Sequence, residues 1–145
     1  MATALNIAKY LLSLSDSDAG DLISNLKLQK LLYYSQGASL AIRDEPLFAD
    51  AIIAWEHGPV VPSVWQSFRE NGSNAIEPSE DFDESTVSTD EKDIVREVYE
   101  VFGQFSAWKL RNMTHNEPPW SETDQNQEIS IPRLKAYFTT LLVDG

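Results

Sequence analysis

The sequence predicts a mainly α-helical protein, a compact single-domain helical bundle with one short strand or small β element. Three observations predict this fold. Apolar residues recur at intervals of three and four in five segments, which is the period of an amphipathic helix. Only residues 51–57 alternate in the manner of a half-buried strand. The length of 145 residues fits one domain, residues 1–145, whose core needs no disulfide or metal.

The first two helices are predicted before residue 44. An apolar stripe near the N-terminus contains Ala4, Ile7, Ala8, Leu11 and Leu12, and SDSDAG at 15–20 ends this helix. Asn25 is the predicted N-cap of the second helix. The stripe of this helix contains Leu28, Leu31, Leu32, Ser35, Ala38 and Ile42. Gly37 costs about 1 kcal/mol relative to alanine inside a helix, so we expect another backbone to pack closely against it.

The segment AIIAWEH, residues 51–57, is the principal predicted strand because it is short and rich in β-branched and aromatic residues. Gly58-Pro59 is predicted to form a tight turn, since glycine adopts backbone angles closed to other residues. Proline suits the first turn of the helix that follows. The apolar stripe of that helix contains Val61, Val64, Trp65 and Phe68, which places Trp65 in the core.

Residues 77–93 contain eight acidic residues and one basic residue. We predict an acidic flexible loop at about 77–88, because its charges repel one another and it lacks apolar anchors. Ser88 and Glu91 have the spacing of a capping box. They open a helix whose length suggests the central position in the bundle. Its apolar stripe contains Ile94, Val95, Val98, Val101, Phe102 and Phe105.

Two further helices are predicted towards the C-terminus. Ser106 caps a short helix that ends near His115, because Pro118-Pro119 cannot continue it. Its apolar residues are Ala107, Leu110 and Met113. Ser130 is the predicted cap of the last helix, whose stripe contains Ile131, Leu134, Phe138, Leu141 and Leu142.

The charge and composition restrict the class of partner. Lys and Arg number 11 against 23 Asp and Glu, which gives a net charge of −12. Direct binding of nucleic acid is not expected, because it depends on basic patches. A basic protein partner suits this charge. The absence of Cys excludes disulfides, thiolate metal sites and cysteine nucleophiles. With no basic leader and no apolar run long enough for a membrane span, we expect a cytoplasmic protein.

Each of the two histidines has a glutamate nearby in the sequence, which defines an alternative function. A small phage-associated or metal-dependent hydrolase would use Glu56, His57, His115 and Glu117. A metal hydrolase needs about three protein ligands and a positioned base. Glu56 and His57 would point to opposite faces of a strand, and no phosphate-binding or nucleophile motif is present. We therefore expect no catalytic residue, no metal and no cofactor.

Large aromatic side chains offer either core packing or partner contact. They include the pair Tyr33-Tyr34 and four tryptophans. Trp120 follows two prolines in a polar stretch. We interpret it first as a side chain that locks this loop, and second as a contact for a partner.

Four segments, in order, resemble one known family. They are LKLQKLLYYSQG, AWEHGPVVPSVWQSF, LRNMTHNEPPW and a closing helix with AYF. Together they resemble the Panacea antitoxin domain, also called the SocA-like or phage-associated-protein domain, of bacterial toxin–antitoxin systems. Matching signature positions also include Leu28, Lys30 and Leu31. The candidate partner-binding or signature residues are Tyr33, Tyr34, Trp55, His57, Gly58, Pro59, Val60, Trp65, Thr114, His115 and Trp120.

The resemblance implies a mainly helical antitoxin that binds and neutralises a cognate toxin protein encoded in an adjacent gene. It also implies a possible second role, because one family member is described as an adaptor that delivers its toxin to a protease. The resemblance assigns no catalytic residue. We expect occlusion of the toxin through a preformed surface, with no membrane partner, and the sequence leaves the oligomeric state open.

Overall fold

The computed structural model describes residues 1–15 and 22–142 and confirms a mainly α-helical fold with one small sheet. The helices are α1 (Ala4–Leu14), α2 (Asn25–Arg43), α3 (Pro62–Phe68), α4 (Thr89–Phe102), α5 (Ala107–His115), α6 (Pro118–Ser121) and α7 (Ile131–Leu142), with short 3-10 turns at Arg69–Asn71 and Glu84–Thr86. The strands are β1 (Ile53–Trp55) and β2 (Gly58–Val60). Of the predicted SDSDAG stop, residues 16–20 lie outside the described residues, as does the side chain of Leu142.

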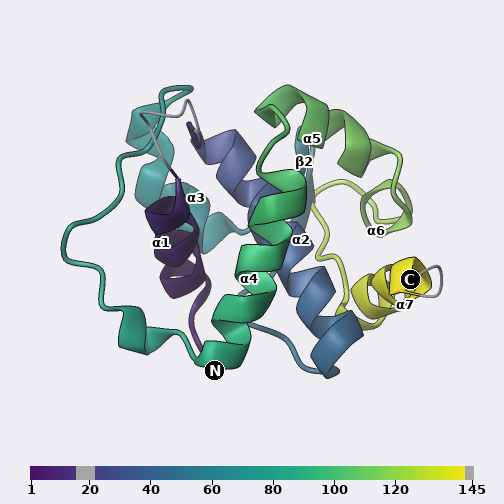
Figure 1. Cartoon of the computed structure of the whole chain (residues 1–145). Helices are drawn as coiled ribbons and strands as arrows, with labels where there is room; N and C mark the ends of the chain where they lie inside the picture. The colour runs from purple at the N-terminus through teal and green to yellow at the C-terminus, as the bar shows by residue number, and fades with distance from the viewer. Residues whose placement is uncertain (16–21, 143–145) are drawn as a thin grey trace.

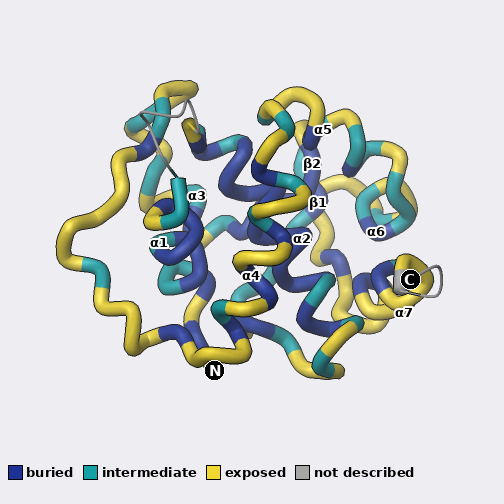
Figure 2. Tube along the Cα trace, viewed as in Figure 1, coloured by how far each residue is buried: buried dark blue, intermediate teal, exposed yellow. Residues whose placement is uncertain are grey.

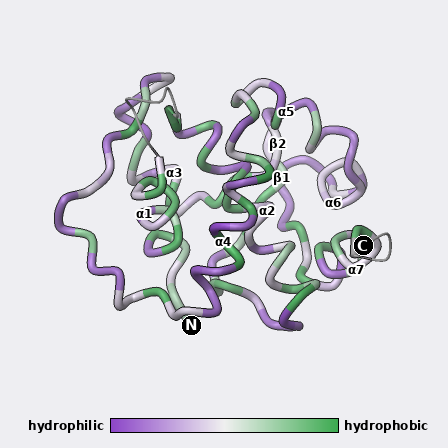
Figure 3. Tube along the Cα trace, viewed as in Figure 1, coloured by the Kyte–Doolittle hydropathy of each residue, from purple (hydrophilic) through white to green (hydrophobic). Residues whose placement is uncertain are grey.

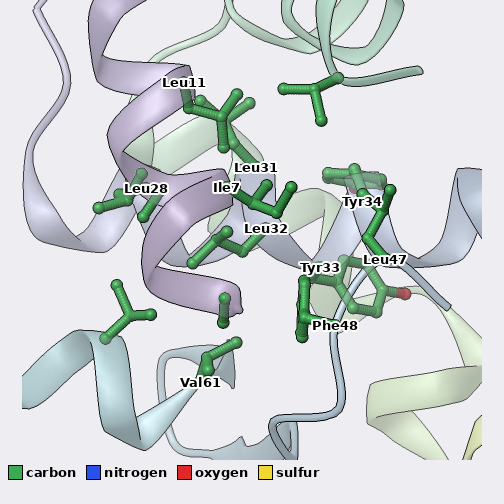
Figure 4. Packing of buried hydrophobic residues seen from close by; sticks show 14 of the residues in the cluster. Ile7, Leu11, Leu28, Leu31, Leu32, Tyr33, Tyr34, Leu47, Phe48 and Val61 are labelled. Carbon is green, nitrogen blue, oxygen red and sulfur yellow. The ribbon is translucent and has the colours of Figure 1, made fainter. Parts of the chain in front are cut away.

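The central helix is α2, not α4 as its length suggested. Helices α1, α3, α4, α5 and α7 and strand β2 all pack against α2 (Figure 1). Helix α2 is therefore buried on every side over most of its length (Figure 2). The close-up in Figure 4 shows Leu28, Leu31 and Leu32 of α2 among the buried side chains of the core. The predicted single apolar stripe of α2 was thus too narrow a description.

Polar side chains of α2 are buried because they hold loops against the helix. The Oε1 atom of Gln29 accepts a hydrogen bond from the backbone N–H of Val61 at 2.9 Å. Gln36 donates to the carbonyl of Phe48 at 2.9 Å and accepts from the N–H of Leu47 at 2.8 Å. Each amide replaces the hydrogen bonds to water that a buried backbone group loses.

Helix capping follows the sequence closely, with one error. Ser88 and Glu91 form the predicted capping box, and Ser106 accepts from the N–H of Lys109. The N-cap of α2 is Ser24, one residue before the predicted Asn25. The Asn25 side chain instead donates to the carbonyl of Trp65 at 3.2 Å. Two adjacent residues of good capping type made this choice ambiguous in the sequence.

The predicted strand is confirmed, but the predicted turn is wrong. Strands β1 and β2 are antiparallel, with Ala54 opposite Pro59 and Trp55 opposite Gly58. The turn therefore lies at Glu56-His57, and Gly58-Pro59 belongs to β2. The backbone of Gln127 bonds to Ala54 on the other side of β1, and this segment covers that edge of the sheet.

The close contact expected at Gly37 is present, but a side chain makes it. A Cβ atom at Gly37 would overlap the ring of Phe138 in α7. Glycine is required here because the aromatic ring rests directly on the α2 backbone, which offsets its cost in a helix. This contact holds the C-terminal helix against the central helix.

Not every residue of the predicted stripes is in the core. Trp65 and Phe105 are only half-buried, and Phe105 lies beyond the end of α4. Four other stripe residues are exposed: Ile42 at 52%, Val101 at 50%, Leu141 at 49% and Ile131 at 40%. Helical phase identifies the apolar face of a helix but not how much of that face a neighbour covers. The apolar and polar segments alternate along the helices in Figure 3.

The acidic segment has apolar anchors, contrary to the sequence expectation. It runs along the margin of the molecule between α3 and α4 (Figure 1). Val87 is buried, and the ring of Phe82 lies 6.3 Å from that of Tyr10. Asp83 caps the 3-10 turn by accepting from the N–H of Ser85 at 3.0 Å. The flexibility of residues 77–88 stays a prediction.

No helix in residues 1–15 and 22–142 has the length and apolar character needed to cross a membrane.

Candidate functional site

Most of the candidate residues meet at one junction, where α2 packs against strand β2 of the hairpin and against α5, and α5 packs against α6. This junction is built from Lys30, Tyr33 and Tyr34 of α2, Gly58 and Pro59 of β2, Thr114 and His115 of α5, and Glu117 and Trp120 around α6. We call it the signature junction. Its internal contacts decide which candidate residues remain available to a partner.

A half-buried carboxylate lies at the centre of the signature junction. The hydroxyl groups of Tyr33 and Tyr34 donate to the two oxygens of Glu117 at 2.9 Å and 2.8 Å. Tyr137 of α7 also hydrogen-bonds to this carboxylate. Burial raises the pKa of Glu117, although the three hydroxyl donors act in the opposite direction. Burial and the neighbouring carboxylate raise the pKa of both Tyr33 and Tyr34, so both remain hydroxyl donors.

Glu117 thus connects α6 to α2 and α7, a structural role that sequence reasoning missed. Its neighbours in the chain, Asn116 and Pro118, gave no hint of it. The adjacent pair Tyr33-Tyr34 was the available signal, because buried tyrosine hydroxyls require hydrogen-bond acceptors.

A second group of contacts in the signature junction surrounds the fully buried Lys30. Its Nζ donates to the carbonyl of Pro59 at 3.1 Å. Burial, with a smaller contribution from the charge of Arg111, lowers the pKa of Lys30 to about 7. Gly58 lies against this side chain with a φ of 112°, and a Cβ atom there would be 2.6 Å from Cε of Lys30. It would also be 2.9 Å from Oγ1 of Thr114. Glycine is therefore required at position 58, because the backbone angle favours glycine and the neighbouring atoms leave no room for a Cβ atom.

A third group of contacts in the signature junction is an aromatic stack. The rings of His115 and Trp120 are nearly parallel, with centroids 4.0 Å apart. The indole N–H of Trp120 donates to the carbonyl of Trp55 at 2.8 Å. Burial, and secondly the charge of Arg111, lowers the pKa of His115, which favours a neutral ring in the stack. These contacts fit the interpretation that Trp120 locks the loop after the two prolines.

The four residues of the hydrolase alternative lie in different environments. His57 is exposed on the hairpin turn, where its Nδ1 accepts from Nε of Arg111 at 3.3 Å. Its neighbour Glu56 is also exposed. His115 is stacked on Trp120, and the tyrosines hold Glu117. In residues 1–15 and 22–142, no group of three or more His, Asp or Glu side chains is placed to hold a metal ion. The hydrolase alternative thus receives no support.

A surface hollow beside the hairpin is lined by four of the candidate partner-binding residues, Trp55, His57, Val60 and Trp65. The hollow has a volume of about 250 Å³ and is lined by Leu26, Trp55, Glu56, His57, Val60 and Trp65. The rings of Trp55 and Trp65 meet edge to face at 6.0 Å. In helix α5, the side chain of Trp108 is 59% exposed, and its ring centroid lies 4.5 Å from the guanidinium carbon of Arg111. Trp65 therefore contributes to a surface rather than to the core.

A second hollow was not predicted. It is a groove of about 330 Å³ between α2, α4 and α7, lined mainly by apolar side chains. We call it the α2–α4–α7 groove. It includes Ile42, Val101 and Leu141, which the sequence analysis placed on buried stripes. The only signal in the sequence was that each stripe continued to the end of its helix.

Comparison with known proteins identifies the family. The model of the SocA-like antitoxin family, described as "Antitoxin SocA-like, Panacea domain", matches residues 28–121. The chain belongs to this family. A segment of 54 residues is also 46% identical to "Antitoxin SocA" of Caulobacter vibrioides (strain NA1000 / CB15N), and it covers 37% of this chain. The same segment covers 29% of that relative, so the chain matches less than a third of its length. No solved structure matches the chain.

The SocA-like match contains the whole signature junction, whereas Tyr137, which bonds to Glu117 from α7, lies outside it. It begins in α2 and ends at Ser121, the last residue of α6. Helices α1 and α7 lie outside it. The Panacea match thus includes two walls of the α2–α4–α7 groove but not the third, which comes from α7.

Proposed function

We propose that this protein is an antitoxin that neutralises a cognate toxin protein, encoded in an adjacent gene, by direct formation of a complex. The match to the SocA-like family over residues 28–121 carries this proposal. In it, residues 1–145 act as one non-catalytic Panacea-like antitoxin domain in the cytoplasm, with residues 77–88 as a flexible acidic loop.

The contacts at the signature junction support a binding role rather than a catalytic one. The carboxylate of Glu117 accepts hydrogen bonds from tyrosine hydroxyls, and one face of the His115 ring is stacked on Trp120. Lys30 is fully buried. The groups most suited to acid–base chemistry therefore make internal contacts, and the surface hollows offer aromatic and aliphatic side chains to a protein partner.

The charge of the protein suits a basic toxin. A net charge of −12 increases the association rate with a positively charged partner, while buried apolar contacts supply most of the affinity. A rigid surface loses little conformational entropy on binding. The loops that are hydrogen-bonded to the buried helix α2 provide such a surface.

Co-expression tests the proposal. Each gene that flanks the gene for this chain is expressed from an inducible promoter, with and without the chain, and growth and co-purification are measured. We expect one product to arrest growth alone, and the chain to restore growth and co-purify with it. A double variant, His57→Gln with His115→Gln, should still neutralise the toxin when it is folded. Neutralisation without a complex would contradict the proposal.

The adaptor role implied by the resemblance stays a prediction. The same strains test it, because an adaptor lowers the amount of toxin in cells that contain the protease and leaves it unchanged in cells that lack it. An antitoxin that acts by occlusion leaves the amount of toxin unchanged in both.

A further inference from the structure

Three side chains that helical phase assigns to the core are exposed at one place. Ile42 of α2, Val101 of α4 and Leu141 of α7 are each about half exposed, and all three line the α2–α4–α7 groove. Single exposed apolar residues are common on protein surfaces. Three that converge from separate helices on one concave surface instead mark an interaction site.

The floor of the groove is rigid. Tyr34 stacks on Phe102 with ring centroids 3.9 Å apart, and its hydroxyl is bonded to Glu117. Phe138 is held against Gly37. Small side chains at Ala38 and Ala41 leave the space above this floor open. The groove therefore exists before a partner binds, which reduces the entropic cost of binding.

One rim of the groove is acidic. Asp90, Asp93, Glu97 and Glu100 are exposed and follow one another at intervals of three and four along α4. Glu97 itself lines the groove. Helix α4 also contains two basic residues, neither of which lines the groove: Arg96 is exposed, and Nζ of Lys92 lies 5.9 Å from the ring of Tyr10 in α1. Lys135 of α7 does not line the groove and is paired with Asp44 at the end of α2.

These features identify the class of partner. The walls of the groove are helices whose backbone groups are already hydrogen-bonded, so an added β-strand finds no partner there. Side chains from a partner helix can fill it. A second copy of this chain would place acidic rims and two charges of −12 against each other. We infer that the α2–α4–α7 groove binds an amphipathic helix of the toxin, with apolar residues in the groove and Lys or Arg beside the acidic rim of α4.

A synthetic peptide tests the groove without the toxin. The probe is an amphipathic helical peptide of leucine and lysine, and its control has glutamate in place of lysine. Titration into the isotopically labelled full chain should shift the amide signals of Ile42, Val101 and Leu141 with the lysine peptide only. Shifts centred elsewhere, or equal binding of both peptides, would overturn the inference.

Variants test the same groove with both the peptide and the toxin. The double variant Val101→Ser with Leu141→Ser should weaken binding by at least about tenfold, because two central apolar contacts are lost. The matched control, Leu22→Ser with Ile131→Ser, removes two exposed apolar side chains outside the groove and should bind like the parent. Glu97→Lys should slow association more than Glu70→Lys in the 3-10 turn after α3, because both variants change the net charge equally but only Glu97 lines the groove. Circular dichroism confirms that each variant is folded.

The inference rests on the proposed function, yet the two can fail separately. If the chain neutralises a flanking gene product and the folded groove variant does so equally well, the groove inference is wrong and the antitoxin proposal stands. If the peptide binds as expected but no flanking product is neutralised, the antitoxin proposal is wrong and the groove still binds basic helices. Dimerisation of the chain that the groove variant abolishes would assign the groove to a second copy and overturn the inference.

Discussion

At the scale of single residues, the junction between α2 and the hairpin depends on groups whose environment is unusual. Lys30 is a cation-forming residue without exposure to solvent, and Gly58 packs directly on it. Both residues are within the segment matched by the SocA-like family. Their packing predicts two measurable effects on stability.

We expect Gly58→Val to lower the free energy of unfolding by about 3 kcal/mol. The new side chain would adopt a strained φ and overlap Lys30 and Thr114. Gly72→Val is the matched control, because Gly72 also has a positive φ but no atom lies within 4 Å of its Cβ position. It should cost about 1 kcal/mol from backbone strain alone. Urea unfolding measures both. A Gly58 variant as stable as the parent that fails to bind toxin would show that the glycine is a recognition element.

Lys30 should make stability depend on pH. Its pKa is about 7 in the folded protein and 10.5 without burial, so the unfolded chain binds more protons between these values. The free energy of unfolding therefore rises from pH 7 to pH 10 through this group, by up to about 4 kcal/mol. Lys30→Met retains the aliphatic chain and removes this contribution. We expect the difference in stability, parent minus variant, to increase with pH. A difference independent of pH would show that Lys30 is not buried in solution.

At the scale of elements, the acidic segment and helix α7 show how local patterns obtain a role from their neighbours. Phe82 and Val87 hold the acidic segment to the core, while most of its carboxylates face solvent. Helix α7 has an apolar stripe of which Phe138 is buried and Leu141 is exposed. In both elements, part of the sequence serves folding and the remainder is available to a partner.

Neutralising exposed acids of residues 77–88 should slow association with a basic toxin at low salt. The variant Glu80→Gln, Asp81→Asn, Glu84→Gln leaves Asp83 unchanged, because that carboxylate caps the 3-10 turn. Long-range attraction acts on encounter, so the dissociation rate should be nearly the same. Surface plasmon resonance at low and high salt measures both rates. An unchanged association rate would remove the steering role from this segment.

At the scale of the whole molecule, negative charge exceeds positive charge by a factor of about two. Acidic residues number 23 and basic residues 11, and the described side chains form two ion pairs, Arg43–Glu45 and Lys135–Asp44. Mutual repulsion of the unpaired charges opposes compaction. The fold is stabilised instead by the apolar core around α2.

Sodium chloride should therefore stabilise the protein at neutral pH. Screening weakens the net repulsion between carboxylates more than it weakens the two ion pairs. We expect the Tm to rise as sodium chloride is added, as measured by thermal unfolding followed by circular dichroism. Sodium sulfate is unsuitable here, because it also strengthens burial of apolar surface. A Tm that falls with added sodium chloride would mean that attractive charge pairs dominate.

The sequence by itself determined the helical class, the position of strand β1, most helix caps and the family. These features depend on local spacing and local hydrogen bonds, as at Ser88 with Glu91. Tertiary structure alone decided that α2 is central, that Gly58 lies in a strand, and that Glu117 binds Tyr33 and Tyr34.

The apolar stripes show most directly what the sequence does not determine. Helical phase places Ile42, Val101 and Leu141 on the same faces as residues that are fully buried, and it was right about the faces. Their exposure depends on where the neighbouring helices end and how they cross, which distant residues such as Gly37 and Phe138 determine. Apolar periodicity is a property of one helix, whereas burial is a property of the contacts between helices.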